Sequence, residues 1–238
     1  MDNTKNSIES PTSAEDYVDR GNEFYNQGDY QAAISDYDEA IRVNPEYAVA
    51  YSNRGAAKSD LGKHFEAISD YDQAIRLDPE YVEAYYNRGN AKLRLEHPEA
   101  AIRDYDEAIR LNPNHAEAYY NRGAAKSDLG KHFEAISDYD EAIRLNLEYT
   151  EAYSNRGNAK LRLRHPEAAI SDYDEAIRLN PKYAIAYNNR GFAKSKLGDL
   201  KGAISDYDEA LRLDPEYATA RTNRENAQSE LRERGAET

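Results

Sequence analysis

The sequence repeats itself with a fixed period. The triplet Asn-Arg-Gly begins at residues 53, 87, 121, 155 and 189, so that consecutive copies are 34 residues apart. An Asp-Tyr-Asp motif recurs with the same period, beginning at residues 36, 70, 104, 138, 172 and 206. A period of this length is typical of an array of stacked units, in which each unit buries its apolar face against its neighbours. The sequence therefore predicts a repeat architecture instead of one central core.

The motifs divide most of the chain into six units. Their boundaries are 14–47, 48–81, 82–115, 116–149, 150–183 and 184–217. We expect residues 1–13 to be a disordered polar leader, although Ser13 and Asp16 have the spacing of a capping box at the start of a first helix. Residues 218–234 keep the apolar spacing of a first helix, so we predict a solvating cap helix there and a tail at 235–238.

Each unit has the pattern of a helical hairpin. When positions are counted from the start of a unit, tyrosine occupies positions 4 and 24 in all six units. At about 100° per residue, positions 4, 7, 8 and 11 share one face of a first helix, and positions 20, 24, 27 and 28 share one face of a second. Position 8 is Gly in every unit, and positions 20 and 27 are Ala. These small residues predict that the two helices of a unit approach closely.

The period, the small residues, the aromatic positions and a proline near the end of most units together resemble the tetratricopeptide repeat (TPR). The resemblance implies an all-α fold, a right-handed superhelical α-solenoid of antiparallel helix pairs plus a C-terminal capping helix. It also implies a non-enzymatic protein-protein interaction module or adaptor, whose first helices line a groove that binds peptides.

Two inward positions depart from the family pattern. Position 7 is Arg where the family has Leu, and position 11 is mostly Lys where the family has Tyr, as in Arg88 and Lys92. Charged side chains on a packing face need carboxylate partners, and the Asp at position 23, such as Asp104, is our candidate. Alternatively, the long side chains extend to water. A greater loss of stability in Asp104→Ala than in Asp106→Ala would favour the buried pair.

Position 6 carries a row of asparagines that resembles the asparagine ladder of O-linked N-acetylglucosamine transferase. An amide offers a donor and an acceptor, which match one peptide group of an extended ligand. The alternative is that Asn is simply the usual residue at this position of the family. The row consists of Asn53, Asn87, Asn121, Asn155, Asn189 and Asn223.

Neighbouring groove positions are predicted to give specificity. They alternate between acidic and basic units. One explanation is that a ligand, or a second copy of the chain, has matching charges. The other is inheritance, because residues 48–115 recur as 116–183 with eleven positions changed. These candidates are Asn90, Asn158, Asp60, Arg94, Asp128, Arg162, Lys196, Tyr86 and Tyr120.

Composition and motifs disfavour other functions. The net charge of -14 argues against nucleic acid as a partner, and glutamates on the groove rim favour a neutral to basic protein segment. We expect no cofactor and no metal site, because there is no cysteine and the histidines at 64, 97, 132 and 165 fall in turns without a second ligand at i+4. No catalytic motif is present, so we expect no enzyme. The absence of a signal or anchor pattern leads us to expect a cytoplasmic protein without direct membrane insertion.

Two functions remain open at this point. The first is an adaptor that binds an extended peptide through the asparagine ladder. The second is a self-assembling structural scaffold, a homo-oligomer that forms through its repeats and through an open N-terminal end near Phe24 and Tyr25.

Overall fold

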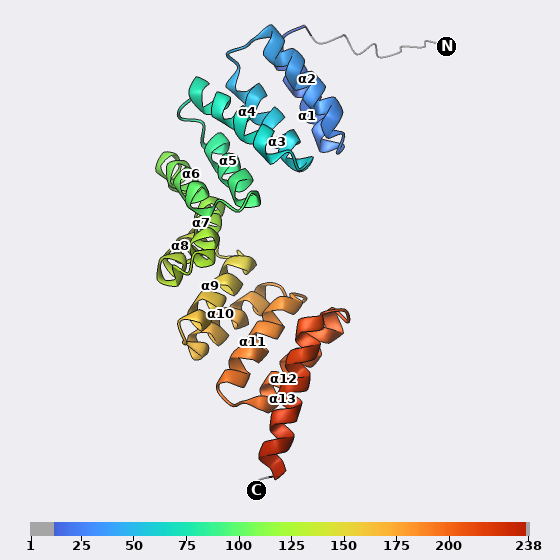
Figure 1. Ribbon diagram of the computed structural model, residues 1–238, viewed down its shortest axis with the longest axis vertical. Coiled ribbons are helices and arrows are strands. Elements are labelled where there is room, and N and C mark those ends of the chain that lie inside the picture. The colour runs from blue at the N-terminus through green and yellow to red at the C-terminus, as the bar shows by residue number, and fades with distance from the viewer. Residues whose placement is uncertain (1–11, 237–238) are drawn as a thin grey trace, which may run out of the picture. The chain divides into compact units, whose positions relative to one another are not determined.

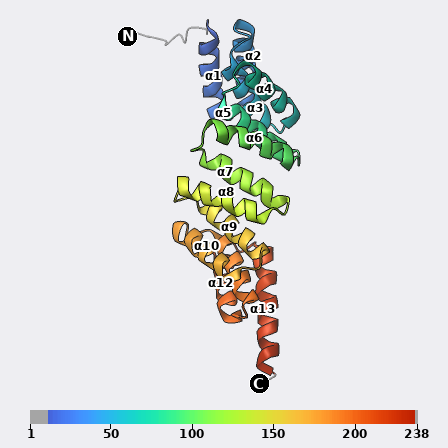
Figure 2. The same cartoon turned by 90° about the vertical axis from the view of Figure 1, so that its left-hand side faces the viewer.

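The computed structural model describes residues 12–236 (Figure 1; Figure 2). Within this range there are thirteen α-helices and no strands, so the all-α solenoid class is confirmed. Predictions for residues 1–11 and 237–238 lie outside the described residues. The helices are α1 (Ala14–Asn26), α2 (Tyr30–Val43), α3 (Ala48–Asp60), α4 (His64–Leu77), α5 (Val82–Arg94), α6 (Pro98–Leu111), α7 (Ala116–Asp128), α8 (His132–Leu145), α9 (Thr150–Arg162), α10 (Pro166–Leu179), α11 (Ala184–Lys196), α12 (Leu200–Leu213) and α13 (Ala218–Ala236).

The first twelve helices form six consecutive antiparallel pairs. We call the odd-numbered helices A helices and the even-numbered ones B helices, and each pair a repeat. The chain divides into two compact units, Met1–Pro113 and Asn114–Thr238, which we treat separately as the N-terminal and C-terminal units. Inside each unit an A helix packs on the B helix of its own repeat and on the next A helix. The helical hairpin is therefore the building block, as the period predicts.

A residue with left-handed backbone lies in the turn inside each repeat. Gly28, Gly62, Gly130 and Gly198 have φ between 75° and 83°, which glycine adopts without steric cost. The third and fifth repeats place Glu96 (φ 61°) and Arg164 (φ 64°) at this position instead. A proline follows in both, at the first turn of α6 and α10. The first helix begins with the predicted capping box, in which Ser13 and Asp16 each accept a backbone hydrogen bond from the other.

The core of each repeat is a tyrosine ring above a glycine. The tyrosines at position 24 are at most 1% exposed, and the alanines at positions 20 and 27 are fully buried. A Cβ atom on Gly89 would lie 2.7 Å from Cε1 of Tyr105. Close packing therefore explains the glycine at position 8, and the atoms nearest to it belong mainly to the tyrosine ring.

The charged positions 7, 11 and 23 form a repeated cluster. In the third repeat, Nη2 of Arg88 lies 2.7 Å from Asp104, and Nζ of Lys92 lies 2.7 Å from the other oxygen of the same carboxylate. This confirms the predicted Arg–Asp pair. A second carboxylate, Asp72 of the preceding repeat, lies 2.5 Å from Nη1 of Arg88. The last residue of the Asp-Tyr-Asp motif, although 55% exposed in Asp72, therefore links one repeat to the next.

The same bridge recurs wherever two successive repeats share a compact unit. In the N-terminal unit Arg54 and Asp38 form it as well, and in the C-terminal unit the pairs are Arg156–Asp140, Arg190–Asp174 and Arg224–Asp208. Each guanidinium at position 7 also lies against the tyrosine ring at position 4, as Arg88 does at 5.5 Å from the centroid of Tyr85. The arginines thus hold both helices of their own repeat and the neighbouring one.

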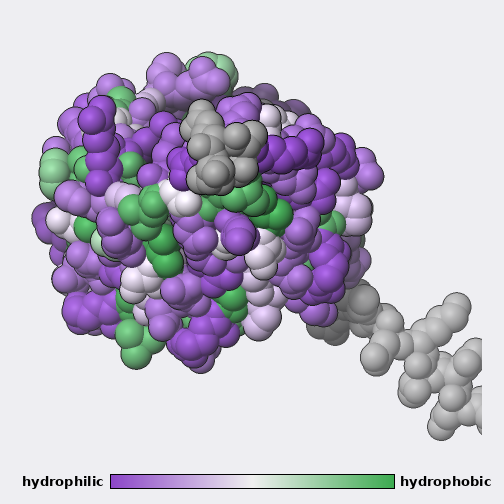
Figure 3. Space-filling model, turned by 90° about the horizontal axis from the view of Figure 1, so that it is seen from below, coloured by the Kyte–Doolittle hydropathy of each residue, from purple (hydrophilic) through white to green (hydrophobic). Residues whose placement is uncertain are grey.

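The last helix covers the end of the sixth repeat. Ala220 and Ala227 of α13 are buried, while Arg221 and Glu225 are exposed where earlier A helices have Tyr and Gly. On the face that Figure 3 shows, hydrophobic side chains form small patches separated by hydrophilic ones. None of the described helices is both long enough and apolar enough to cross a membrane.

Candidate functional site

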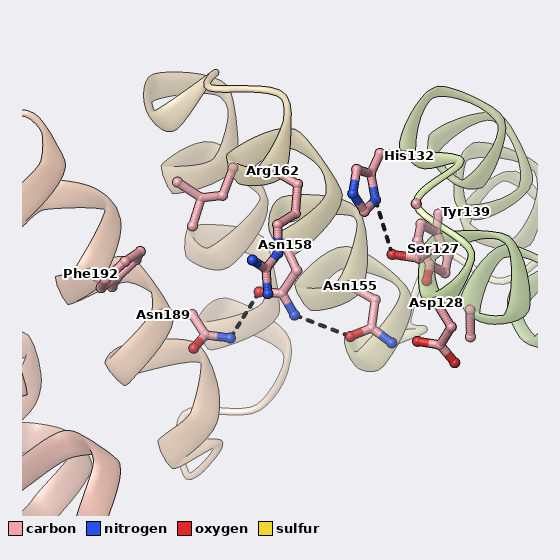
Figure 4. Close-up of a pocket in the computed structure, with 12 residues that line it drawn as sticks. Ser127, Asp128, His132, Tyr139, Asn155, Asn158, Arg162, Asn189 and Phe192 are labelled. Carbon is pink, nitrogen blue, oxygen red and sulfur yellow. Dashed lines mark hydrogen bonds between the residues drawn. The ribbon is translucent and has the colours of Figure 1, made fainter.

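A pocket lies on the A-helix face of the C-terminal unit (Figure 4). Its volume is about 850 Å³, and most of its lining comes from α7, α9 and α11. We call it the groove pocket. It is lined by Ala124, Ser127, Asp128, Gly130, His132, Tyr139, Asn155, Asn158, Leu161, Arg162, Asn189 and Phe192. Five of the residues predicted from the sequence therefore meet in one place: Asn155, Asn158, Asn189, Asp128 and Arg162.

The ladder asparagines are held by hydrogen bonds to the preceding repeat. Nδ2 of Asn155 donates to the hydroxyl of Tyr120 at 2.9 Å, and Nδ2 of Asn189 donates to Oδ1 of Asn158 at 3.0 Å. Their own oxygens accept one bond each, from Asn158 and from Asn188. A side-chain amide has two donor hydrogens and two lone pairs. Each of these two amides therefore keeps one donor and one acceptor for a ligand, in a fixed orientation.

Two other ladder members follow the same rule. Asn53 donates to Asn22 at 2.9 Å, and Asn223 donates to Asn188 at 3.0 Å. Among the described residues Asn87 has no hydrogen-bond partner, because the preceding repeat offers only Ser52 and Ala56 at the two positions that hold partners elsewhere. Asn121 lies on α7 at the same position. The ladder is thus visible as a set of hydrogen bonds between repeats.

The asparagines at position 9 accept hydrogen bonds from buried tyrosines, a structural role that was not predicted from the sequence. Oδ1 of Asn158 accepts from the hydroxyl of Tyr173 at 2.8 Å in addition to the bond from Asn189. Asn90 accepts in the same way from Tyr105 at 2.7 Å. The buried tyrosine hydroxyl of these repeats needs a partner, and Asn at position 9 supplies it. Part of the alternation between repeats is therefore explained by packing.

The predicted groove charges differ in their partners. Asp60 in the N-terminal unit accepts a hydrogen bond from Tyr25 at 2.5 Å. Within the described part of the chain, neither Asp128 nor Arg162 has a hydrogen-bond or ion-pair partner, and both are exposed. Nζ of Lys196 lies 4.9 Å from the ring centroid of Phe192. Arg94 is exposed near the end of α5. The pocket of the C-terminal unit therefore presents both an acid and a base that have no such partner among the described residues.

The two predicted tyrosines pack inside their units. The ring of Tyr86 lies 6.0 Å from that of Tyr105, and the ring of Tyr120 lies 4.7 Å from that of Tyr149. Burial raises the pKa of Tyr120 to about 12, so that its hydroxyl stays protonated at neutral pH and serves Asn155.

Sequence reasoning did not place Phe192, His132 and Tyr139 in the pocket. Phe192 is 40% exposed at position 9, where the other repeats have Ala or Asn, and an aromatic residue on that polar face was a usable signal. His132 begins α8, with Nδ1 3.4 Å from Oγ of Ser127, so this turn histidine belongs to the pocket. Tyr139 also lines it, and its hydroxyl has no partner among the described residues because position 9 of this repeat is Ala124.

Comparison with known families decides the affiliation. A model described as a TPR repeat matches residues 21–62, 59–95 and 167–198. A model of the tetratricopeptide repeat matches residues 82–115 and 184–217, and a second such model matches residues 104–137. Together the matches span most of the repeats. The chain belongs to the tetratricopeptide repeat family. It is a TPR protein-interaction module, as the resemblance implied. No curated protein sequence matches this chain.

Solved structures of TPR proteins share the fold. YrrB, described as a TPR protein with an unusual peptide-binding site, is 24% identical with a TM-score of 0.68, over 79% of this chain and 97% of YrrB. MamA is 28% identical with a TM-score of 0.65, over 69% of this chain and 96% of MamA. PilF from Pseudomonas aeruginosa is 18% identical with a TM-score of 0.78, over 91% of this chain and 97% of PilF.

Proposed function

We propose that this TPR protein is a non-enzymatic adaptor that binds an extended segment of a partner protein in the groove pocket. The carrying observation is the pair of pre-oriented amides of Asn155 and Asn189, each with one donor and one acceptor left for a ligand. One peptide group presents one N–H and one C=O, so each amide matches one peptide group without reading its side chain. Internal hydrogen bonds that fix the amides also reduce the entropy lost on binding.

The size and lining of the groove pocket support this proposal. A volume of about 850 Å³ accommodates several residues of an extended chain. The peptide-binding site named in the description of YrrB is a property of that protein, but it agrees with a role of this kind for the shared fold. A cytoplasmic location is part of the same proposal.

Self-assembly as a scaffold has less support. That alternative depended on an open N-terminal end, but Phe24 and Tyr25 are half-buried and pack against the core of the first repeat. The ring of Tyr25 also lies 5.3 Å from that of Tyr30. Sedimentation velocity over a range of concentrations tests this alternative, since a concentration-dependent increase in sedimentation coefficient would revive it.

The adaptor proposal is tested with a random peptide library displayed on phage and panned against the immobilised chain. Peptides that are selected should bind the double variant Asn155→Ala/Asn189→Ala at least about tenfold more weakly, because two peptide groups lose their partners. Gln31→Ala, which removes an exposed amide on α2, is the control and should bind as the wild type does. Circular dichroism shows whether both variants fold. Peptides that bind all three proteins equally would refute the site.

A further inference from the structure

We infer that the groove pocket selects a segment with a central acidic side chain, flanked about three residues away by a basic side chain on one side and an aromatic or aliphatic side chain on the other. This rests on the proposed function, because it specifies the ligand of the same pocket. Three observations on the C-terminal unit carry it: two unpaired charges, an exposed aromatic ring and the side-by-side packing of the A helices.

The first observation concerns which charges a ligand can meet. Arg156 and Lys160 of α9 are both bound to Asp172, and Arg190 and Lys194 of α11 are both bound to Asp206. These cations are neutralised inside the repeats. Asp128 on α7 and Arg162 on α9 line the pocket, and neither has such a partner among residues 12–236. The pocket thus offers an acid on one A helix and a base on the next, although the whole chain carries a net charge of -14.

The second observation is the apolar part of the pocket lining. Phe192 of α11 and Leu161 of α9 line the pocket, and Phe192 is 40% exposed. The ammonium group of Lys196 lies over the ring of Phe192, where it covers part of one face of the ring and adds positive charge. An aromatic or aliphatic ligand side chain would bury the remaining ring surface, and a second base there would be repelled.

The third observation sets the spacing. Successive A helices contact one another in this unit, α7 with α9 and α9 with α11. Packed helices lie about 8–10 Å apart. A polyproline II segment rises about 3.1 Å per residue with three residues per turn, so that every third side chain faces the same way about 9 Å further on. A ligand of the form Lys-x-x-Glu-x-x-Phe therefore places Lys at Asp128 and Glu at Arg162, which share position 13 of their repeats. Its Phe then reaches α11, where Phe192 lies at position 9, one helical turn before the equivalent position.

The amides fit this conformation as well. Polyproline II has no internal hydrogen bonds, so its peptide groups are available to side chains of the pocket. Asn155 and Asn189 each offer one donor and one acceptor, and the unpaired hydroxyl of Tyr139 adds another group near Asp128. Backbone recognition would then give affinity, while Asp128, Arg162 and Phe192 would give the order of side chains.

The test uses three synthetic peptides with serine at the x positions. Lys-x-x-Glu-x-x-Phe and Phe-x-x-Glu-x-x-Lys cover both directions of the chain in the pocket. Glu-x-x-Lys-x-x-Phe has the same composition but puts a base opposite Arg162. By fluorescence anisotropy at low salt, one of the first two should bind about threefold to tenfold more tightly than the third. Equal affinities of all three, or no binding by any of them, would overturn the inference.

Two variants with the same change in net charge locate the effect. Arg162→Glu should reverse the preference, so that the peptide with central Lys binds better. Arg164→Glu makes the same change two residues away, in the turn, where Glu96 occupies the equivalent place of the third repeat with a similar φ. It should leave the preference unchanged, and a reversal of equal size in both variants would contradict the assignment.

The two proposals can fail separately. If phage-selected peptides depend on Asn155 and Asn189 but show no preferred order of charges, the adaptor function stands and this inference fails. If peptides with a central acid are selected but bind the ladder variant unchanged, the charges matter and the ladder does not.

Discussion

Replacing Asp104 with alanine should lower the free energy of unfolding by about 3 kcal/mol. The Asp104 side chain is 5% exposed and binds both Arg88 and Lys92, and these two cations are 17% and 21% exposed. Removing one partner of a buried ion pair typically costs about 3–5 kcal/mol, because the other charge is left without compensation. The lower end applies here, since Arg88 keeps Asp72 and the ammonium of Lys92 can move toward water.

Asp72→Ala provides a matched control, because it removes the other carboxylate from the same arginine. The Asp72 side chain is 55% exposed and contacts a single guanidinium nitrogen. An exposed ion pair contributes about 0.2–1 kcal/mol, so this variant should lose no more than that. Although burial by itself lowers the pKa of Arg88, the hydrogen bonds to Asp104 and Asp72 raise it overall, so the arginine stays charged in every variant.

Urea unfolding followed by circular dichroism measures both losses. Repeat arrays can unfold in segments, so the slope of each transition has to agree with the wild type before midpoints are compared. A triple variant, Arg88→Leu/Lys92→Tyr/Asp104→Ala, replaces the cluster by the residues of the family pattern at positions 7 and 11. It should recover most of the stability that Asp104→Ala loses. Similar losses for Asp104→Ala and Asp72→Ala would refute the reasoning and favour side chains that simply extend to water.

Three further predictions follow from the same packing. Gly89→Ala should destabilise the chain by about 1–2 kcal/mol despite the better helix propensity of alanine, because the new Cβ would lie 2.7 Å from the ring of Tyr105. A smaller cost in a Tyr105→Leu background would identify the ring as the obstacle. A stabilising effect would contradict the packing. Asn158→Ala should lower the free energy of unfolding in urea by about 1–3 kcal/mol, since it leaves the buried hydroxyl of Tyr173 without its acceptor. Asn87→Ala, which removes no hydrogen bond, should be nearly neutral. Equal losses in the two variants would argue against the structural role of position 9. Burial raises the pKa of Tyr37 and Tyr207 to about 12, and it also raises the pKa of Tyr71, Tyr105, Tyr139 and Tyr173. The free energy of unfolding should therefore stay constant below pH about 10, the pKa of tyrosine in the unfolded chain, and fall as the pH rises toward 12. Tyrosinate absorbance that appears fully at pH about 10 without unfolding would refute this.

The period and the helical spacing of the tyrosines determined the fold from the sequence. Each repeat presents its apolar residues within about 34 positions, and local helix packing brings them together without distant parts of the chain. The pairing of Arg88 with Asp104 was predictable for the same reason, since both lie in one hairpin. The ladder positions were also readable, because position 6 recurs on one face of every A helix.

Only the tertiary structure decided how those groups are used. Whether an amide at position 6 is fixed by a hydrogen bond depends on the residue that the preceding repeat places beside it. Tyr120 accepts a hydrogen bond from Asn155, whereas the equivalent residue before Asn87 is Ser52 and no such bond forms. The second partner of Arg88 comes from the neighbouring repeat, and the pocket joins residues from three repeats. A sequence fixes what one hairpin contains, whereas contacts between hairpins depend on the distance and rotation from one repeat to the next, which no single repeat encodes.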